Sequence, residues 1–246
     1  MLRRYGASLL LLMALALFWE GACRLLSIPA YILPAPSRAL LALWQWRGPL
    51  LTEHLPVTAT EVLIGLSLSL LLGLASALAM HLSPIVSRTL YPLLVASQTI
   101  PVIAISPVFL FWFGYSLTQK VAVVMLITFF PIAVNTYDGL RSSDSELLNW
   151  MRAAGASRWR ILRMVEIPSA LPAFFTGMKV AATVSVIGAV IGEWLGGQAG
   201  LGVFGRRAAA GLKSPELFAS VFLLAMLGIA LFALTAWVER RFSYQR

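Results

Sequence analysis

The stretch NWMRAAGASRWRILRMVEIPSALP, Asn149 to Pro172, decides how the rest of the chain is interpreted. It carries four arginines and one glutamate, yet it lies between two apolar stretches of a chain that is 59% hydrophobic and 12% charged. Soluble domains carry about 25% charged residues. The composition therefore predicts an all-α integral membrane protein that places one basic segment between two of its membrane spans.

Long apolar runs without charged residues predict the spans, because about 20 apolar residues cross a bilayer as a helix. With the first residues inside, the inner segments, which include Arg3, Arg4 and Arg246, hold more basic residues than the outer ones. Because basic residues gather on cytoplasmic loops, we expect both termini in the cytoplasm. The same rule explains the net charge of +9, so no nucleic-acid partner is expected. The six predicted spans cover about residues 5–23, 58–81, 89–113, 120–135, 171–192 and 217–238.

The first predicted span has two alternative interpretations. A basic start followed by an apolar run resembles a signal peptide, but residues 5–23 lack a clean small-x-small cleavage site. A lipoprotein site at Cys23 is disfavoured because Glu20 stands where such a site normally has leucine. We therefore expect the first span to be retained.

The segment before Asn149 has the pattern of a helix start. Ser143 and Glu146 fit a capping box, in which the serine side chain bonds the backbone N–H of the glutamate. The helix that follows presents one apolar face, since its apolar residues recur at i, i+3, i+4 and i+7. This face consists of Leu147, Trp150, Met151 and Ala154.

A second short helix is expected after a glycine turn. Gly155 suits the left-handed position at a helix C-terminus, Ser157 can cap the next helix, and Pro168 should end it. We call residues 141–168 the elbow segment. Its arginines could hold anionic lipid at the membrane surface. A compact, capped helix with Trp150 and Met151 beside Arg152 is more typical of a docking element for another protein.

The spans give few signs of their own driving force. Ion-coupled transporters usually need buried ionisable groups, and no Asp, Glu, Lys or Arg occurs in residues 62–80, 89–113, 121–137, 180–192 or 217–238. The segment GYSLTQK, Gly114 to Lys120, lacks the second glycine and the Ser/Thr of a phosphate-binding loop. An external ATPase is therefore expected to drive any transport.

The third predicted span contains a break. QTIPVIAISP, Gln98 to Pro107, places two prolines where each removes a backbone hydrogen bond. Such breaks are tolerated where a cavity or neighbouring helices satisfy the freed carbonyls. We expect either a kinked helix that lines a pathway or an ordinary kink in a packed bundle. The candidate pathway residues are Gln98, Thr99, Pro101, Asn135, Thr183 and Ser185, and the alternative for each polar one is an interhelical hydrogen bond.

The elbow segment resembles the cytoplasmic loop of permease subunits from bacterial binding-protein-dependent ABC importers. Their motif is E-A-A-x3-G-x9-I-x-L-P, and Gly155, Val165, Ile167 and Pro168 meet the spacing from glycine to proline. The Glu-Ala-Ala positions depart from the motif, since they are Asn149-Trp150-Met151. Three further segments are similar to the permeases of the nitrate, sulfonate, taurine and thiamine-precursor group. Their sequences are most similar to permeases for the thiamine pyrimidine precursor. The segments are ASQTIPVIAISPVFLFWFGY from Ala96, FFPIAVNTYDGLR from Phe129 and GAVIGEWLGGQAGLG from Gly188.

The resemblance implies a type I, MetI-like permease of the bacterial cytoplasmic (inner) membrane that is not itself an enzyme and needs no cofactor. Its implied partners are two ATP-binding subunits, an extracytoplasmic substrate-binding protein, a second copy of itself and membrane lipid. It implies a first helix and outer loop in 1–56 and a transporter domain in 57–241, with the elbow segment at 141–168. The implied ATPase contacts are Ser143, Glu146, Trp150, Met151, Arg152, Ala154, Gly155, Ala156, Ser157 and Arg158.

Glu193 and Trp194 lie at the outer end of the fifth span. They are candidates for an outer gate or a binding-protein contact, and the alternative is an interfacial aromatic anchor. The glycines that follow, Gly196, Gly197, Gly200 and Gly202, predict a flexible loop.

Two other classes of function stay open at this point. A membrane-embedded enzyme would need clustered nucleophiles, bases or metal ligands, whereas the two histidines, His54 and His81, lie at opposite ends of the second span. A membrane scaffold without transport activity is the other.

Overall fold

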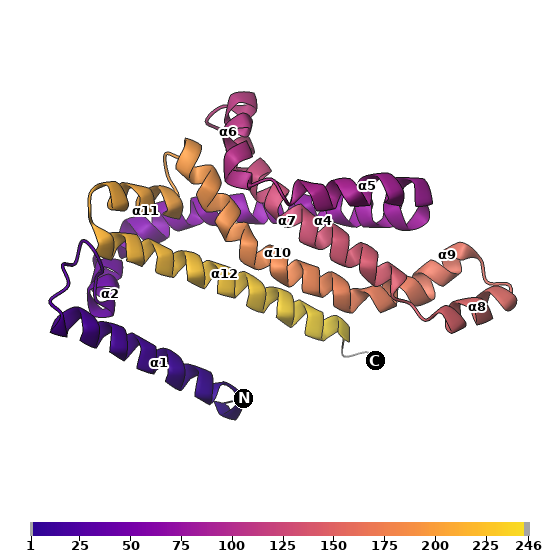
Figure 1. Cartoon of the computed structure of the whole chain (residues 1–246), viewed down its shortest axis with the longest axis horizontal. Helices are drawn as coiled ribbons and strands as arrows, with labels where there is room; N and C mark the ends of the chain where they lie inside the picture. The colour runs from indigo at the N-terminus through magenta and orange to yellow at the C-terminus, as the bar shows by residue number, and fades with distance from the viewer. Residues whose placement is uncertain (1, 244–246) are drawn as a thin grey trace. The chain divides into compact units, whose positions relative to one another are not determined.

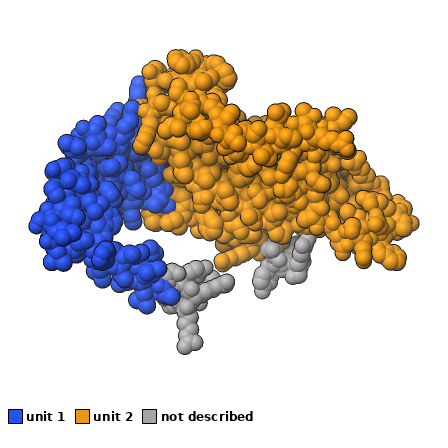
Figure 2. Space-filling view, in the orientation of Figure 1, with its two compact units in different colours: residues 1–58, 198–225 blue, residues 59–197, 226–246 orange. Residues whose placement is uncertain are grey.

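The computed structural model describes residues 2–243, and within them the side chains of all but residues 2–5, 8, 9 and 243 (Figure 1). The side chains of Arg3 and Arg4 and the whole of Arg246, which entered the orientation prediction, lie outside this description. The described residues form helices and connecting turns. Two compact units result, one of Met1–Thr58 with Gln198–Ala225 and one of Ala59–Gly197 with Met226–Arg246 (Figure 2).

The first unit is built around a small apolar core. Its helices are α1 (Leu2–Leu25), α2 (Pro36–Gln45), α3 (Arg47–Pro49), the π-helical turn η1 (Leu50–His54), α11 (Leu201–Ala210) and the first part of α12 (Ser214–Ser243). Pro36 begins α2, where its missing N–H leaves no bond unmade. The core comprises Ala42, Leu50, Leu201, Phe204 and Ala219.

The start of α11 is held by side chains from a distant part of the same unit. The Gly200 N–H donates to Nδ1 of His54 at 3.1 Å, and the Leu201 N–H donates to the Thr58 hydroxyl at 2.8 Å. Gly200 itself has φ of 125°, which side chains rarely tolerate. Because residue 202 lies inside α11, Gly202 belongs to a buried helix and not to the flexible loop expected from the sequence.

The second unit contains the long helices. They are α4 (Leu55–Leu82, of which residues 59–82 belong here), α5 (Pro84–Ser97), α6 (Val102–Phe113), α7 (Leu117–Arg141), α10 (Ile167–Gly196) and the later part of α12 (Ser214–Ser243). Three short elements lie between α7 and α10, namely α8 (Ser145–Ala153), α9 (Arg158–Ile161) and the π-helical turn η2 (Leu162–Glu166).

Helices α7 and α10 pack against each other at close range (Figure 1). Glycines allow the approach, because a Cβ at Gly177 would collide with the Pro131 backbone and one at Gly188 with the Val124 backbone. Small residues of this kind let membrane helices come together, where no hydrophobic effect drives them to do so. The pair α7–α10 is therefore the centre of this unit.

Four helical stretches among the described residues are long and apolar enough to cross a membrane, or five if the bent pair α5–α6 counts as one span. The four are Arg47–Leu82, Leu117–Arg141, Arg158–Gly196 and Ser214–Phe242. Helix α1, where the first span was expected, is not among them, so a count of six spans remains a prediction. The four stretches and the bent pair coincide with the other five expected spans.

The expected break in the third span is present, and it falls at Pro101, the N-cap of α6, whereas Pro107 lies inside that helix. The expected effect of Pro168 is wrong. Pro168 does not end a helix, because α9, η2 and α10 form one continuous stretch, Arg158–Gly196. Pro168 falls in the first turn of α10, directly after the π-helical turn, and the N-terminal turn of a helix tolerates proline.

Candidate functional site

The elbow segment begins with a capped helix, although not with the expected cap. The Asp144 carboxylate accepts a hydrogen bond from the Glu146 N–H at 2.8 Å and is the N-cap of α8. The predicted capping serine, Ser143, is wrong, because its hydroxyl is buried without a hydrogen-bond partner. A carboxylate at this position also opposes the positive end of the helix dipole, which stabilises the start of α8.

The glycine turn has the expected geometry. Gly155 has φ of +77°, in the left-handed region. Its N–H bonds the Arg152 carbonyl at 3.0 Å, and the Ala156 N–H bonds the Met151 carbonyl at 2.9 Å. This pair of bonds defines a Schellman motif. Ser157 then caps α9 by accepting from the Arg160 N–H at 3.3 Å, so both predictions for this turn are confirmed.

The second arm of the elbow segment is tied to the end of α4. Nε2 of His81 lies 2.8 Å from the Glu166 carboxylate, and both side chains are largely buried. The Arg158 guanidinium donates to the Leu82 carbonyl at 2.8 Å, which satisfies one of the free carbonyls at the C-terminus of α4. A cavity of about 400 Å³ lies between these groups and is also lined by Arg152, Ala156 and Ile161. A displacement of the elbow segment would therefore be transmitted to α4.

The other face of the elbow segment is open. In Figure 1, α8 and α9 project from the end of the second unit that lies away from α6. Trp150 is 74% exposed, and Trp159 and Met164 are each 63% exposed. None of the ten implied ATPase contacts is buried. Exposed aromatic residues around an arginine are the usual anchors of protein interfaces.

A buried charged cluster joins three long helices of the second unit. Nζ of Lys120 on α7 lies 2.7 Å from Oε1 of Glu61 on α4, and Glu193 on α10 interacts with the same carboxyl group. Glu61 and Glu193 are fully buried, and Lys120 is 9% exposed. Glu193 therefore presents no surface to a partner here, whereas its neighbour Trp194 is 46% exposed.

The sequence reasoning missed this cluster. It treated the spans as free of buried ionisable groups from residue 62 onward and so stopped one residue short of Glu61. It likewise began the charge-free range of the fourth span at residue 121, directly after Lys120. The sequence did contain a signal for the cluster, because one charged residue lies near an end of each of three apolar stretches. Charged residues of opposite sign in a membrane usually pair.

Lys179, which lies within the fifth predicted span, also has a partner. Its Nζ lies 2.9 and 3.0 Å from the two Glu239 carboxylate oxygens, so α10 and α12 are bridged by an ion pair.

The structure does not gather the pathway candidates of α7 and α10 at one site. Thr183 is exposed and Ser185 is buried, and each hydroxyl bonds a carbonyl three residues earlier in α10 at 2.7 Å. The Asn135 amide bonds the Pro131 carbonyl of its own helix at 2.8 Å, and its Cβ faces Gly177. The interhelical hydrogen bonds considered as the alternative are thus replaced by bonds within each helix.

The break in the third span is sharper than a kink. Helices α5 and α6 meet at an angle of 103° across residues 98–101. Gln98, Thr99 and Pro101 are exposed at this break, and the Thr99 hydroxyl bonds the Ala96 carbonyl at 2.7 Å. Non-helical backbone within a membrane span is found where it lines a cavity or lies within protein, so these three residues remain the better pathway candidates.

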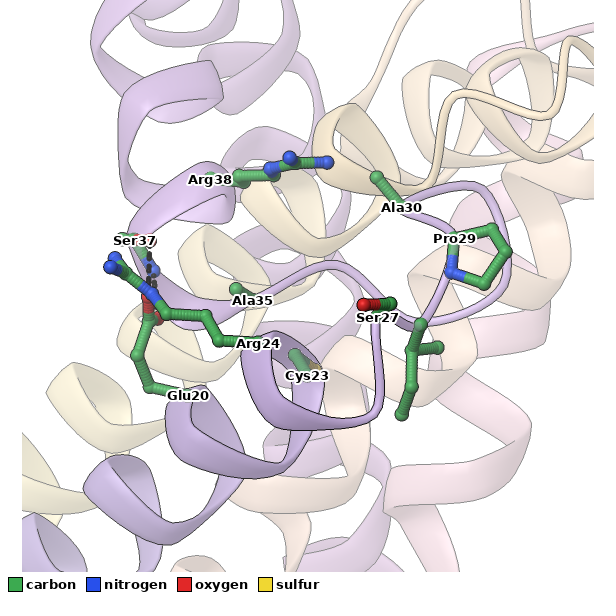
Figure 3. A pocket seen from close by; sticks show the side chains of 10 residues that line it. Glu20, Cys23, Arg24, Ser27, Pro29, Ala30, Ala35, Ser37 and Arg38 are labelled. Atoms are coloured by element: carbon green, nitrogen blue, oxygen red, sulfur yellow. Dashed lines mark hydrogen bonds and ion pairs between the residues drawn. The ribbon is translucent and has the colours of Figure 1, made fainter.

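The first unit contains a separate polar cavity of about 580 Å³ (Figure 3). In the close-up, Glu20 and Arg24 of α1 converge on Ser37, which begins α2. The Glu20 carboxylate accepts from the Ser37 N–H at 2.9 Å and from its hydroxyl at 2.7 Å. Glu20 therefore serves as a cap for α2 from another helix, and both residues line the cavity.

A profile of the family described as the binding-protein-dependent transport system inner membrane component matches residues 69–244. The chain belongs to this family. It is therefore an inner-membrane permease subunit of an ABC importer, and a permease of this kind is not catalytic, since a partner subunit hydrolyses ATP.

Curated relatives of this permease cover nearly its whole length. The formylaminopyrimidine transport permease ThiX of Halalkalibacterium halodurans is 44% identical over 91% of this chain and 89% of its own. The riboflavin transport permease RibX of Chloroflexus aurantiacus is 40% identical over 93% and 86%. A putative aliphatic sulfonates permease, SsuC of Bacillus subtilis, is 27% identical over 97% and 88%.

A solved structure confirms the fold. The inward-facing MetNI methionine ABC transporter matches 76% of this permease and 93% of its own chain, with a TM-score of 0.66 and 18% identity. The all-α, MetI-like architecture expected from the sequence is thereby confirmed.

Proposed function

We propose that this permease forms the translocation pathway of its importer and that the ATP-binding subunit binds the elbow segment. The observation that carries the proposal is the two-sided construction of the elbow segment. One side exposes Trp150 and Trp159, and the other is bonded to α4 through His81 and Glu166. A partner held on the exposed side would move the membrane helices.

Membership of the family supports proposals for the remaining partners. We expect two ATP-binding subunits, a second copy of the permease and an extracytoplasmic substrate-binding protein. The elbow segment would face the cytoplasm, with both termini on the same side. We retain Gln98, Thr99 and Pro101 as pathway residues because they lie at the sharp break between α5 and α6. Glu193 is retained as part of an outer gate, while Trp194 is a candidate for contact with the binding protein.

For the solute, we propose a thiamine pyrimidine precursor. The support is the identity of 44% to a formylaminopyrimidine permease, compared with 27% to a sulfonate permease. Riboflavin is the second candidate, because a riboflavin permease is 40% identical. Sulfonate, taurine and nitrate were alternatives from the sequence and are less supported.

Co-purification tests whether the ATP-binding subunit binds the elbow segment. The permease, expressed with its ATP-binding subunit, should retain that subunit in mild detergent. Trp150→Ala should weaken the association, whereas Trp44→Ala, which removes a tryptophan of the first unit that is 65% exposed, should not. Equal retention by both variants would contradict the proposal.

Uptake tests the solute separately. Deleting the gene should abolish uptake of labelled formylaminopyrimidine and leave taurine uptake unchanged. Loss of riboflavin uptake alone would instead assign the second candidate.

A further inference from the structure

A cationic cavity lies where three helices of the second unit end or begin. Its volume is about 430 Å³, and its walls come from the end of α4, the start of α5 and the end of α7. The stretch Leu117–Arg141 is 25 residues long and apolar enough to span a membrane. Because about 20 residues cross the hydrocarbon core, its last turn, and with it the cavity, lies at the depth of the lipid headgroups.

Two arginines from different helices line this cavity. Arg88 of α5 and Arg141 of α7 are both exposed, and no acidic side chain is part of the lining. Among the described residues, neither guanidinium forms an ion pair with a carboxylate. Glu166, which contacts His81 in the cavity wall, lines the neighbouring cavity of about 400 Å³ instead. Two positive charges therefore face the cavity without a counter-charge from the protein.

Tyr137 holds one of these arginines in place. It is 5% exposed, its hydroxyl is hydrogen-bonded to the Ser87 hydroxyl of α5, and it accepts a hydrogen bond from the Arg141 guanidinium at 3.3 Å. The guanidinium carbon also lies 5.4 Å from the centre of the Tyr137 ring. These contacts join α5 to α7 and position Arg141 in the cavity wall without neutralising its charge.

The start of α5 adds to the positive potential of the cavity. Pro84, the first residue of this 14-residue helix, is part of the lining. The first turn of a helix carries the positive end of the helix dipole and has backbone N–H groups without a partner in the helix. An anion in this cavity would therefore interact with two guanidinium groups and with a helix N-terminus.

The outer face of α5 is apolar. Ile85 and Leu93 are exposed on it, whereas Leu94 packs into the core cluster that contains Tyr137. A molecule that fits both features has an anionic group at headgroup depth and apolar chains beside it. In a membrane that molecule is an anionic phospholipid, and basic pockets between membrane helices are known to hold such headgroups.

We propose that this cavity binds the phosphate of an anionic phospholipid, with Arg88 and Arg141 as its ligands and the acyl chains along the exposed face of α5. Guanidinium groups bind phosphate oxygens through two parallel hydrogen bonds, which gives arginine an advantage over lysine here. The proposal goes beyond the proposed function. Neither arginine is among the implied ATPase contacts, so the two proposals can fail independently.

Lipid retention by the full chain in detergent tests the proposal. The purified permease would be titrated with dioleoylphosphatidylglycerol or with dioleoylphosphatidylcholine, and bound lipid would be counted by native mass spectrometry. The wild-type protein should retain one phosphatidylglycerol more tightly than phosphatidylcholine, because the two lipids have the same acyl chains and differ in headgroup charge. Inorganic phosphate in large molar excess should not displace it, since phosphate lacks the apolar chains.

Substitutions assign the bound lipid to the cavity. Arg88→Gln and Arg141→Gln should each weaken phosphatidylglycerol binding about fivefold, the effect of removing one basic residue near an anionic lipid. Tyr137→Phe keeps both charges and should weaken binding less than Arg141→Gln. The matched control is Arg240→Gln, which removes an exposed arginine near the end of the spanning stretch Ser214–Phe242 and outside the cavity. It should bind phosphatidylglycerol as the wild-type protein does.

Thermal unfolding shows whether each variant is folded and gives a second readout. A lipid that binds the folded protein raises its unfolding midpoint, so phosphatidylglycerol should raise the midpoint of the wild-type protein and of Arg240→Gln more than that of Arg88→Gln or Arg141→Gln. Equal retention of the two lipids by the wild-type protein would overturn the proposal, as would unchanged phosphatidylglycerol binding in both cavity variants. Displacement of the lipid by inorganic phosphate would overturn the assignment to a lipid, because the cavity would then select the free anion.

Discussion

At the scale of single residues, Gly155 and Arg152 set the geometry of the elbow segment. The left-handed conformation of Gly155 lets the chain reverse within one residue after α8. Arg152 bonds the Asn149 side chain at 3.0 Å and lies in the last turn of α8, where a cation opposes the negative end of the helix dipole. The orientation of Trp150 and Trp159 relative to each other depends on this turn.

Gly155→Val is expected to abolish most uptake while the protein still inserts and folds. A β-branched residue in the left-handed region costs roughly 1–2 kcal/mol, and the turn can relax because no atom lies within 4 Å of the added Cβ. Uptake and ATP hydrolysis would be measured together. Gly48→Val, at a glycine with equal space and an ordinary φ, should transport normally, and normal uptake by Gly155→Val would refute the role of the turn.

Arg152→Glu should uncouple ATP hydrolysis from transport. The substitution reverses the charge of an exposed side chain and places an acid at the negative end of α8, which costs about 0.3–1 kcal/mol of local stability. The measurement is the ratio of solute transported to ATP hydrolysed in proteoliposomes. Arg206→Glu, at an exposed arginine of α11, is the matched control. An unchanged ratio in Arg152→Glu would show that this arginine is not part of the coupling contact.

At the scale of elements, two connections account for the second unit: the close contact of α7 with α10, and the tie between η2 and the end of α4. The positions of the long helices were predictable because apolar runs of sufficient length have few alternatives in a membrane. The continuation through Pro168 was not predictable from the rule that proline ends a helix, since the π-helical turn before it shifts the hydrogen-bond register. The cap of α8 was assigned to Ser143 when the adjacent Asp144 forms it, because both residue types cap helices well.

Gly188→Val should destabilise the second unit. The new Cβ would meet the Val124 backbone, which cannot move without separating α7 from α10. Overpacking of this kind costs roughly 1–3 kcal/mol, which should lower the thermal unfolding midpoint in detergent. Ile187→Val, at an exposed neighbour on the same helix, provides the comparison. An unchanged midpoint for Gly188→Val would show that the helices are not in close contact.

His81→Ala and Glu166→Ala should each reduce uptake without releasing the ATP-binding subunit. Both residues lie behind the exposed face of the elbow segment. Their loss should therefore affect the transmission of motion to α4 and not the binding of the ATP-binding subunit. Since the two side chains contact each other, the double variant should be no worse than the more severe single variant. Additive losses, or loss of the ATP-binding subunit from the purified protein, would contradict this assignment.

At the scale of the whole molecule, the sequence sufficed for the family and the membrane architecture but not for the clusters of charged residues. The motif spacing from Gly155 to Pro168 is local, so it could be recognised in the sequence alone. The Glu61–Lys120–Glu193 cluster and the His81–Glu166 pair join residues from separate helices, and no local pattern predicts which charges will meet. The first unit was likewise only partly predictable, because α2 and α11 are short helices held by Glu20, His54 and Thr58 from elsewhere in the chain.

The most direct test of the account is a photo-crosslink from position 150 of the assembled importer. With Trp150 replaced by benzoylphenylalanine, irradiation should join the permease to its ATP-binding subunit. The same replacement at Phe111, which is 85% exposed on α6, should not. An importer that still transports solute but gives no adduct from position 150, or gives equal adducts from both positions, would contradict the claim that the elbow segment is where ATP-driven motion enters the permease.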